Sequence, residues 1–252
     1  MANHSSQSPL RVAVVGAGFI ADFHLEVLKN TPEVELVAVC DAVLEKAEAK
    51  AKQFAIPHAV ASISELKDLG VNMASLLLPP PLHSSLIRET LEAGIGVMVE
   101  KPMVLSSEDA RELGALANSK GLPLAVNHNA VTHPSFAALC KRIEDGEIGR
   151  VEHVRVTLSV PLRQLDAGDF SHWMFRTPAN IVFEQGPHPC AQVHALVGSV
   201  KTATTTVLKS RELHPGQQFN NRWLIAAEAE RGCRSEERRV GKECRIGCRS
   251  RW

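Results

Sequence analysis

The sequence contains no tyrosine, and its other aromatic residues are few: 8 phenylalanines and 3 tryptophans among 252 residues. Surfaces that bind single-stranded nucleic acid usually stack bases on aromatic side chains, so we expect no nucleic-acid partner. No apolar run approaches the roughly 18 residues of a membrane span, so we expect no membrane partner either. The polar residues 1–9 lack the apolar core of a secretory signal. The 6 cysteines form no CxxC pair and no disulfide-rich pattern, which favours a reducing, cytoplasmic location.

A formal net charge of zero conceals an uneven distribution of charge. From Arg231 onward the chain has eight basic and three acidic residues, whereas the part before it has 20 and 25. The basic surplus therefore belongs to the last stretch, and the rest of the chain is mildly acidic. A hydrophobic fraction of 44% and a length of 252 residues are typical of a globular protein with one or two domains.

A glycine-rich sequence lies between a predicted strand and a predicted helix near the N-terminus. The β-branched run at residues 11–15 leads directly into GAGFIA at residues 16–21, and a helical pattern follows. Gly16 permits a tight turn, Gly18 lets a pyrophosphate approach the backbone, and the small Ala21 lets the helix pack on the strand. The first amides of the helix can then bind phosphate oxygens. The GxGxxA pattern in this context predicts a dinucleotide-binding turn.

An acidic residue ends the next predicted strand. Residues 35–40 form a second apolar run, and Asp41 follows where a carboxylate can accept hydrogen bonds from the ribose of a dinucleotide. The alternative is that Asp41 caps the helix predicted at residues 44–53. No arginine occurs among the next three residues, so nothing in this segment pairs with the 2′-phosphate of NADP. We therefore expect NAD as the cofactor, with NADP as the alternative.

Strands and helices alternate over residues 10–127, which predicts an α/β domain with a doubly wound parallel sheet. Beyond the segments above, strands are expected at 73–78, 96–99 and 124–126, and helices at 83–93 and 107–120. A further short helix is expected to begin after Ser62, which has the spacing of a capping box with Glu65. Three prolines at residues 79–81 form a rigid loop at the end of one strand. His83 opens the next helix, where it could cap that helix or contact the cofactor.

The tripeptide Glu100-Lys101-Pro102 closes the apolar strand at residues 96–99. A lysine at the carboxyl end of a parallel strand lies where open α/β sheets bind their ligands. Pro102 keeps Lys101 out of the helical region of backbone conformation, so the extended chain holds the ammonium group over that crevice. The alternative is an ordinary charged strand end followed by a turn. The neighbouring motifs favour the first interpretation.

The pattern changes after residue 127, and we predict a second domain of α+β type over residues 128–232. Helices are expected at 135–145 and 189–197, an alternating strand at 151–160, and further strands at 202–207 and 222–227. Residues 169–180 are expected to be mostly loop. The alternating strand favours an open, largely antiparallel sheet with one solvated or partner-covered face. The predicted fold class is therefore α/β: an N-terminal Rossmann domain followed by an incomplete α+β domain.

Taken together, these motifs resemble the Gfo/Idh/MocA family of oxidoreductases, which includes glucose–fructose oxidoreductase and inositol dehydrogenase. The resemblance runs from about Arg11 to about Glu230 and rests on five features in order: the turn Gly16-x-Gly18-x-x-Ala21, Asp41, Pro79-Pro80 with His83, Glu100-Lys101-Pro102, and the pair Glu184 and His188. It implies an NAD(P)-dependent enzyme that moves a hydride between the nicotinamide and a hydroxyl or carbonyl carbon. The implied substrate is a sugar, cyclitol or related small alcohol, and the full-length form is expected to be a homo-oligomer.

The resemblance also implies roles for individual residues. Lys101 would hydrogen-bond the substrate hydroxyl near the nicotinamide, and the bond after it is often cis in this family. His188 would be the general acid/base, and Glu184 would bind a substrate hydroxyl or orient that imidazole. Glu184 departs from the family's usual aspartate, and Pro178-Ala179-Asn180 replaces its usual glycine-rich run. The residues expected to contact the cofactor are Gly16, Gly18, Phe19, Ile20, Asp41, Leu78, Pro79, Pro80, His83, Glu100, Lys101 and Asn129.

Trp173 and Arg176 are weaker candidates for the substrate pocket. An arginine there could hold a carboxylate or phosphate of the substrate, and a surface ion pair is the alternative. No metal site is expected, because Cys244 and Cys248 lack further ligands for zinc. Two other functions stay open: a non-catalytic NAD(P)-binding regulatory protein, and a reductase of a C=C or C=N bond, which would not need His188 as an alcohol base.

Residues 233–252 do not resemble the rest of the chain. They lack an amphipathic period, and a tail that binds nucleic acid or membrane is disfavoured because acidic residues interrupt the basic ones. From Arg234 they resemble the in-frame translation of a sequencing-adapter oligonucleotide. The family usually continues well beyond this point, so we expect the natural protein to be longer. We also expect the chain as written to be poorly soluble or inactive, because its sheet would have an unpaired edge.

Overall fold

A computed structural model of the chain describes residues 9–214, 216–229 and 244–249. The described residues fall into two compact units, which divide between Asn127 and His128. Within these residues, no helix has both the length and the apolar character needed to cross a membrane.

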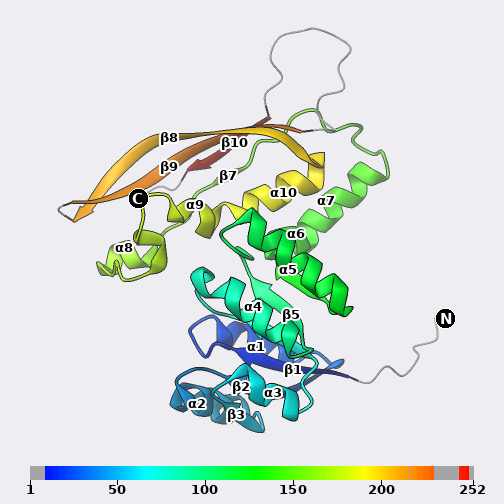
Figure 1. The fold of residues 1–252 in the computed structure, drawn as a ribbon. Coiled ribbons are helices and arrows are strands. Elements are labelled where there is room, and N and C mark those ends of the chain that lie inside the picture. The colour runs from blue at the N-terminus through cyan, green and yellow to red at the C-terminus, as the bar shows by residue number, and fades with distance from the viewer. Residues whose placement is uncertain (1–8, 215, 230–243, 250–252) are drawn as a thin grey trace. The chain divides into compact units, whose positions relative to one another are not determined.

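The first unit is built on a six-stranded parallel sheet in the order β3-β2-β1-β4-β5-β6. Figure 1 labels β1, β2, β3 and β5 of this sheet. Its strands are β1 (Leu10–Val15), β2 (Val34–Cys40), β3 (His58–Val60), β4 (Met73–Leu76), β5 (Gly96–Glu100) and β6 (Leu124–Asn127). The strand order reverses between β1 and β4, which are hydrogen-bonded neighbours. Ligands of open α/β sheets bind at such a switch point, outside the carboxyl ends of the strands. The doubly wound fold predicted from the sequence is confirmed.

Helices connect these strands: α1 (Ala21–Lys29), α2 (Leu44–Phe54), α3 (Ile63–Asp68), α4 (His83–Glu92) and α5 (Ser107–Lys120), with a 3-10 turn η1 (Pro80–Leu82) before α4. The capping box predicted at Ser62 is present, with Glu65 as its second member. Ser106 caps α5, and Gly121 ends that helix in the left-handed conformation. Strand β3 was not predicted, because three residues are too few to show a period of two.

Two apolar clusters, one on each face of the sheet, form the core of the first unit. Leu25 of α1 and Ala51 of α2 pack with Val14 in one cluster. Leu66, Ile87, Leu91 and Leu113, from α3, α4 and α5, pack in the other cluster. Strand residues alternate between the faces, and both faces are covered, so β1, β2 and β4 read as continuous apolar runs.

The second unit combines short helices with a four-stranded sheet in the order β7-β10-β9-β8. Its helices are α6 (Asn129–Thr132), α7 (Pro134–Glu144), α8 (Arg163–Ala167), η2 (Trp173–Phe175), α9 (Asn180–Gln185) and α10 (Pro187–Val197), and its strands are β7 (Thr157–Leu158), β8 (Val200–His214), β9 (Gln217–Ala229) and β10 (Cys244–Arg249). The longest pairing is the antiparallel hairpin of β8 and β9. The predicted open and largely antiparallel sheet is confirmed.

Several predictions for the second unit were wrong. The long strand expected at residues 151–160 is reduced to β7, because the apolar residues before it pack on a helix instead of pairing in a ladder. Val154, for example, packs with Val193 and Val197 of α10. Strands β8 and β9 extend well beyond the predicted strands, and residues 180–185, for which no element was predicted, form helix α9.

The segment 233–252, for which no helix or strand was predicted, contributes β10. This strand pairs antiparallel with β9 over Cys244–Arg249 and parallel with β7 over two positions. The remaining parts of that segment lie outside the described residues, as do residues 1–8.

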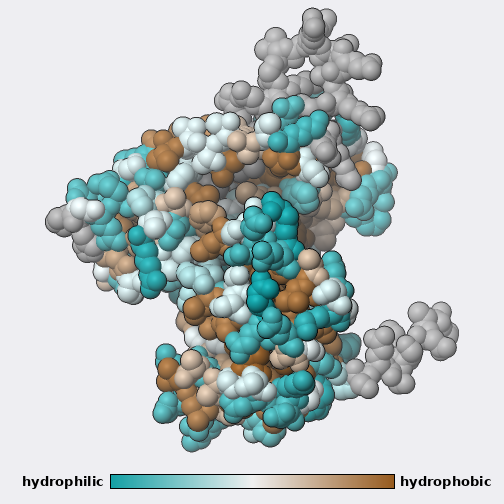
Figure 2. Space-filling model, in the orientation of Figure 1, coloured by the Kyte–Doolittle hydropathy of each residue, from teal (hydrophilic) through white to brown (hydrophobic). Residues whose placement is uncertain are grey.

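The surface mixes polar and apolar side chains (Figure 2). Phe19 is 72% exposed, Phe23 of α1 is 56% exposed, and their rings meet edge to face with centroids 5.4 Å apart. Scattered exposed apolar residues are common on folded proteins. The exposed Phe19 lies within the glycine-rich turn, on the side where the sequence predicts the cofactor.

Replacing the fully buried Leu91 by alanine is expected to lower the free energy of unfolding of the first unit by about 2–5 kcal/mol, because apolar contact is lost and a cavity remains. Leu44→Ala, at a leucine that is 39% exposed, is the matched control and should change that energy by less than about 0.5 kcal/mol. Urea unfolding followed by far-ultraviolet circular dichroism measures both. Equal effects of the two substitutions would contradict the assigned core.

Candidate functional site

The turn between β1 and α1 has the backbone that a dinucleotide requires. Gly16 has a φ of 104°, and a Cβ added there would lie 2.6 Å from the carbonyl oxygen of Leu77. No other residue fits this position, since both the conformation and the space exclude a side chain. At Gly18 a Cβ would meet nothing within 4 Å, so open space lies over the backbone where a pyrophosphate would approach. The turn therefore fits the predicted ligand.

Asp41, at the end of β2, is bound to the same turn. Its Oδ2 accepts a hydrogen bond of 2.8 Å from the amide of Ala17, and its Oδ1 accepts one of 2.9 Å from the amide of Val43. Helix α2 begins after Val43 and has no side-chain cap, so Asp41 does not cap it directly. A carboxylate has about four acceptor positions, so both oxygens can still accept hydrogen bonds from ribose hydroxyls. Asp41 thus fixes the glycine-rich turn and keeps capacity for a ligand.

His83, the first residue of α4, is fully buried. Its Nε2 lies 2.7 Å from the carbonyl oxygen of Leu78, and its Nδ1 lies 2.8 Å from that of Pro102 and 3.1 Å from that of Met103. The ring therefore lies between the loop after β4 and the loop after β5. It does not cap α4, which was one of the two roles considered from the sequence.

Glu100, at the end of β5, is the centre of a polar network that joins three elements. Its Oε1 accepts hydrogen bonds from Nε2 of His24 on α1 at 3.0 Å and from Nδ2 of Asn127 on β6 at 2.6 Å. Its Oε2 lies 3.3 Å from the amide nitrogen of Lys101. The side chains of His24 and Glu100 are only 13% and 16% exposed. Sequence reasoning missed His24 and Asn127; the signal for His24 was a polar residue one turn after Ala21 in a helix packed on the sheet.

The network holds Glu100 in its ionised form. Burial would raise the pKa of the Glu100 carboxyl group, but hydrogen bonds from His24 and Asn127 and the charges of His24 and Lys101 together outweigh burial. The pKa of Glu100 is therefore lowered from its ordinary value of 4.5. A fixed carboxylate directly before Lys101 limits the conformations of that loop.

Lys101 is partly buried and is followed by a cis peptide bond to Pro102, as the family resemblance implied. The carboxyl ends of β1, β2, β4 and β5 thus gather the glycine-rich turn, Asp41, the Pro79-Pro80 loop and Lys101 at one edge of the sheet. Ile20 and Leu78 belong to these same loops, whereas Asn129 is an exposed residue of α6 in the second unit.

The predicted pair Glu184 and His188 lies in the second unit, on two consecutive helices. Glu184 is in α9 and His188 is in α10, with Gly186 between them. A Cβ on Gly186 would clash with the carbonyl oxygen of Val182, so only glycine lets the two helices meet this closely. Glu184 and His188 are therefore four positions apart on either side of Gly186, whose backbone is in the right-handed helical region.

Trp173 is 6% exposed, and its Nε1 donates a 2.7 Å hydrogen bond to Oε2 of Glu184. The carbonyl of Trp173 accepts a hydrogen bond from Asn180 at the start of α9, so the 3-10 turn η2 is fixed to this helix. Arg176, also considered for the substrate pocket, is exposed. Trp173 therefore supports Glu184 through its indole, a contact that sequence reasoning did not foresee.

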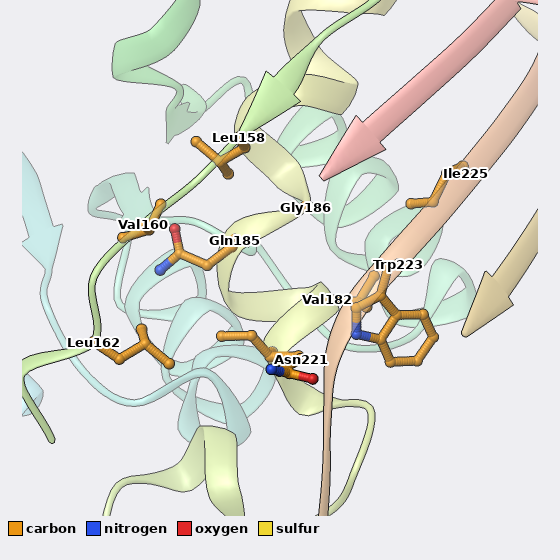
Figure 3. Close-up of a pocket in the computed structure, with 10 residues that line it drawn as sticks. Leu158, Val160, Leu162, Val182, Gln185, Gly186, Asn221, Trp223 and Ile225 are labelled. Carbon is orange, nitrogen blue, oxygen red and sulfur yellow. The ribbon is translucent and has the colours of Figure 1, made fainter. Parts of the chain in front are cut away.

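A small apolar pocket lies between α9 and β9 (Figure 3). Among the described residues that line it, Gln185 and Asn221 are polar; the others are Leu158, Val160, Leu162, Ile181, Val182, Gly186, Trp223 and Ile225. A sugar or cyclitol needs a hydrogen-bonding partner for most of its hydroxyl groups, and this lining does not supply them. The pocket is therefore a poor site for such a substrate.

The fold and motifs agree with those of known proteins. Residues 10–128 match the model of the family described as an oxidoreductase family with an NAD-binding Rossmann fold. These residues are thus similar to the Rossmann domain of that family. The first unit is accordingly an NAD-binding domain, and its Gly16 turn and Asp41 are the parts that fit the dinucleotide.

Individual relatives are sugar and diol dehydrogenases. D-apiose dehydrogenase of Paraburkholderia graminis is 30% identical over 141 residues, which are 54% of this chain and 37% of that protein. Trans-1,2-dihydrobenzene-1,2-diol dehydrogenase of Mus musculus is 34% identical over 159 residues, or 62% and 48%. The solved structure of GenD2 from gentamicin A biosynthesis, in complex with NAD, is 26% identical with a TM-score of 0.77 over 99% of this chain and 68% of that chain. The chain spans less than half the length of these two curated relatives.

Replacing Glu100 by glutamine is expected to lower the stability of the first unit by about 1–3 kcal/mol at pH 7, because two hydrogen bonds lose their charged acceptor. A carboxyl group whose pKa is lowered by folding stabilises the fold above its ordinary pKa of 4.5, and this stability is lost as the pH falls through the folded value. The difference between wild type and variant should therefore shrink below pH 4.5.

Hydrogen exchange of the β5 and β6 amides from pH 7 to pH 4 measures this difference, after correction for the intrinsic pH dependence of exchange. Glu112→Gln, which removes an exposed ion pair with Arg88, is the control and should have little effect. An effect of Glu100→Gln that does not change with pH would contradict the assignment.

Proposed function

We propose that the protein is an NAD-dependent oxidoreductase that transfers a hydride between the nicotinamide and a hydroxyl or carbonyl carbon of a sugar, cyclitol or related small alcohol. The observation that carries the proposal is the placement of Lys101 on the same sheet edge as the glycine-rich turn and Asp41. The names of the relatives, which include sugar and diol dehydrogenases, support the substrate class. A cytoplasmic location and assembly into a homo-oligomer belong to the same proposal.

The preference for NAD over NADP follows from Asp41. Its two oxygens are fixed by backbone amides of the turn and of the segment before α2. A 2′-phosphate would be placed against this carboxylate, and the next three residues, Ala42, Val43 and Leu44, offer it no cation. Ribose hydroxyls can instead donate hydrogen bonds to Asp41.

The proposed chemistry divides between three side chains. The bound nicotinamide would supply the hydride acceptor or donor. Lys101 would donate a hydrogen bond to the reacting oxygen, and His188 would take the hydroxyl proton or return it. Glu184, fixed by the indole of Trp173, would bind a further hydroxyl or orient the imidazole.

Asp41→Ser is expected to weaken NAD binding by roughly ten-fold or more, because charged acceptors for the ribose and for the amide of Ala17 are both lost. Binding of NADP should weaken less or improve, so the preference between the cofactors narrows. Fluorescence titration with NADH and NADPH measures both affinities. Asp68→Ser, at an exposed acid in α3, controls for net charge; a preference unchanged by Asp41→Ser would contradict the role.

Turnover should depend on Lys101 and His188, whereas cofactor affinity should not. Lys101→Met and His188→Gln are each expected to lower kcat by roughly 100-fold or more while the Kd for NADH changes by less than about three-fold. Because the relatives are longer, turnover with a panel of sugars and cyclitols is measured both for this chain and for a chimera that continues after Ala229 with the corresponding residues of the mouse relative.

The outcomes separate the candidate functions. Cofactor binding without turnover in both proteins would favour a regulatory NAD-binding protein. Turnover that survives His188→Gln would favour reduction of a C=C or C=N bond, which needs no alcohol base.

A further inference from the structure

His83 is a buried titratable residue to which the chemistry above gives no role. Its ring is 0% exposed, so in this structure it presents no surface to a cofactor or substrate. Three backbone carbonyl oxygens lie within 2.7–3.1 Å of its two nitrogens. Two of these carbonyls, from Pro102 and Met103, directly follow Lys101.

The geometry fixes the hydrogen-bonding state of the ring. A carbonyl oxygen can only accept a hydrogen bond, so a ring nitrogen at 2.7 or 2.8 Å from one must carry a proton. Nε2 faces Leu78 and Nδ1 faces Pro102, so both nitrogens must donate. A neutral imidazole has one N–H and would leave a lone pair directed at a carbonyl oxygen. Each ring nitrogen is therefore placed to donate to a carbonyl of a different loop.

The two loops that His83 joins both belong to the edge where the cofactor is expected. One contains Leu78, Pro79 and Pro80; these prolines have no N–H, so this part of the loop cannot be held through backbone donors. The other contains Lys101, Pro102 and Met103, in which Pro102 likewise lacks a donor. The ring of His83 can supply hydrogen-bond donors to carbonyl oxygens of both loops, where the prolines supply none.

We propose that His83 is a positioning residue: through hydrogen bonds from both ring nitrogens, it ties the loop after Lys101 to the proline loop after β4 and thereby fixes the backbone of Lys101. On the other side, the amide of Lys101 lies against the carboxylate of Glu100. The lysine is thus held between two side chains that act on its backbone, Glu100 before it and His83 after it. The consequence for catalysis rests on the proposed function, whereas the clamp itself does not.

Three variants test the clamp in the 252-residue chain. His83→Ala removes both donors, and His83→Gln keeps one. Thr90→Val is the matched control, because Thr90 is also fully buried in α4 but donates only to Leu86 within the same helix. Hydrogen exchange is measured on peptides that cover the two loops and, for comparison, on peptides from β2 and α2.

His83→Ala should accelerate exchange in both loops by roughly ten-fold or more and leave β2 and α2 within about two-fold, because only local hydrogen bonds are lost. His83→Gln should give an intermediate acceleration and provides a second variant if His83→Ala does not fold. Thr90→Val should not accelerate exchange in the two loops more than in β2 and α2. Acceleration spread evenly over the unit, or the same pattern in Thr90→Val, would show an ordinary core residue and overturn the proposal.

The double donation is tested separately. Nitrogen-15 spectra of histidine-labelled protein at pH 7 should show both His83 nitrogens protonated, with the signal assigned by its loss in His83→Gln. Added imidazole should restore loop protection to His83→Ala, whereas 1-methylimidazole, which as a cation has a single N–H, should not. A neutral ring, or equal rescue by both compounds, would overturn the doubly donating clamp.

The effect of His83 on catalysis is measured in the chimera described above, provided that the chimera shows turnover. His83→Gln should lower kcat by roughly ten-fold with a change of less than about three-fold in the Kd for NADH, because Lys101 is misplaced while the glycine-rich turn is intact. An unchanged kcat would overturn the link to Lys101. If wild-type protein shows no turnover, the proposed function fails, and the exchange and nitrogen-15 measurements still decide the clamp.

Discussion

The carboxylate of Glu100 is the interaction on which the candidate site depends. It accepts hydrogen bonds from His24 on α1 and Asn127 on β6, and it lies against the amide of Lys101. A parallel sheet brings the carboxyl ends of its strands to one edge but does not fix the loops that follow them. Glu100 fixes one of these loops and also ties the helix of the dinucleotide-binding turn to the strand that precedes Lys101.

Backbone requirements that have a local cause could be read from the sequence. Gly16 and Gly18 were recognised because the turn needs residues without side chains, and the structure shows the reason at Gly16, where a Cβ would lie against the carbonyl of Leu77. The continuous apolar strands and the capping box at Ser62 are equally local signals. These signals predicted the first unit nearly completely, and only the short strand β3 was missed.

Side-chain partners that are distant in the sequence could not be read in this way. His24 and Glu100 are separated by 76 positions, and Trp173 reaches Glu184 across a 3-10 turn that has no clear sequence pattern. In the second unit the alternating residues 151–160 resembled a strand, although only Thr157 and Leu158 pair in a ladder. Hydrophobic alternation reports which residues are buried, and a ladder additionally needs a neighbouring strand with free hydrogen-bonding groups.

Buried polar groups are a costly way to stabilise a fold. Replacing a buried ion pair by apolar residues of similar volume is often neutral or stabilising, because two groups no longer lose their hydration. The sheet edge nevertheless contains both a His24–Glu100 pair and a His83 ring that donates to backbone carbonyls. Apolar residues could fill the same space, but they could not fix the direction of the loop backbone, since packing contacts lack the angular preference of hydrogen bonds. Their common location, on either side of Lys101, indicates that the orientation of this one residue is what these polar groups provide.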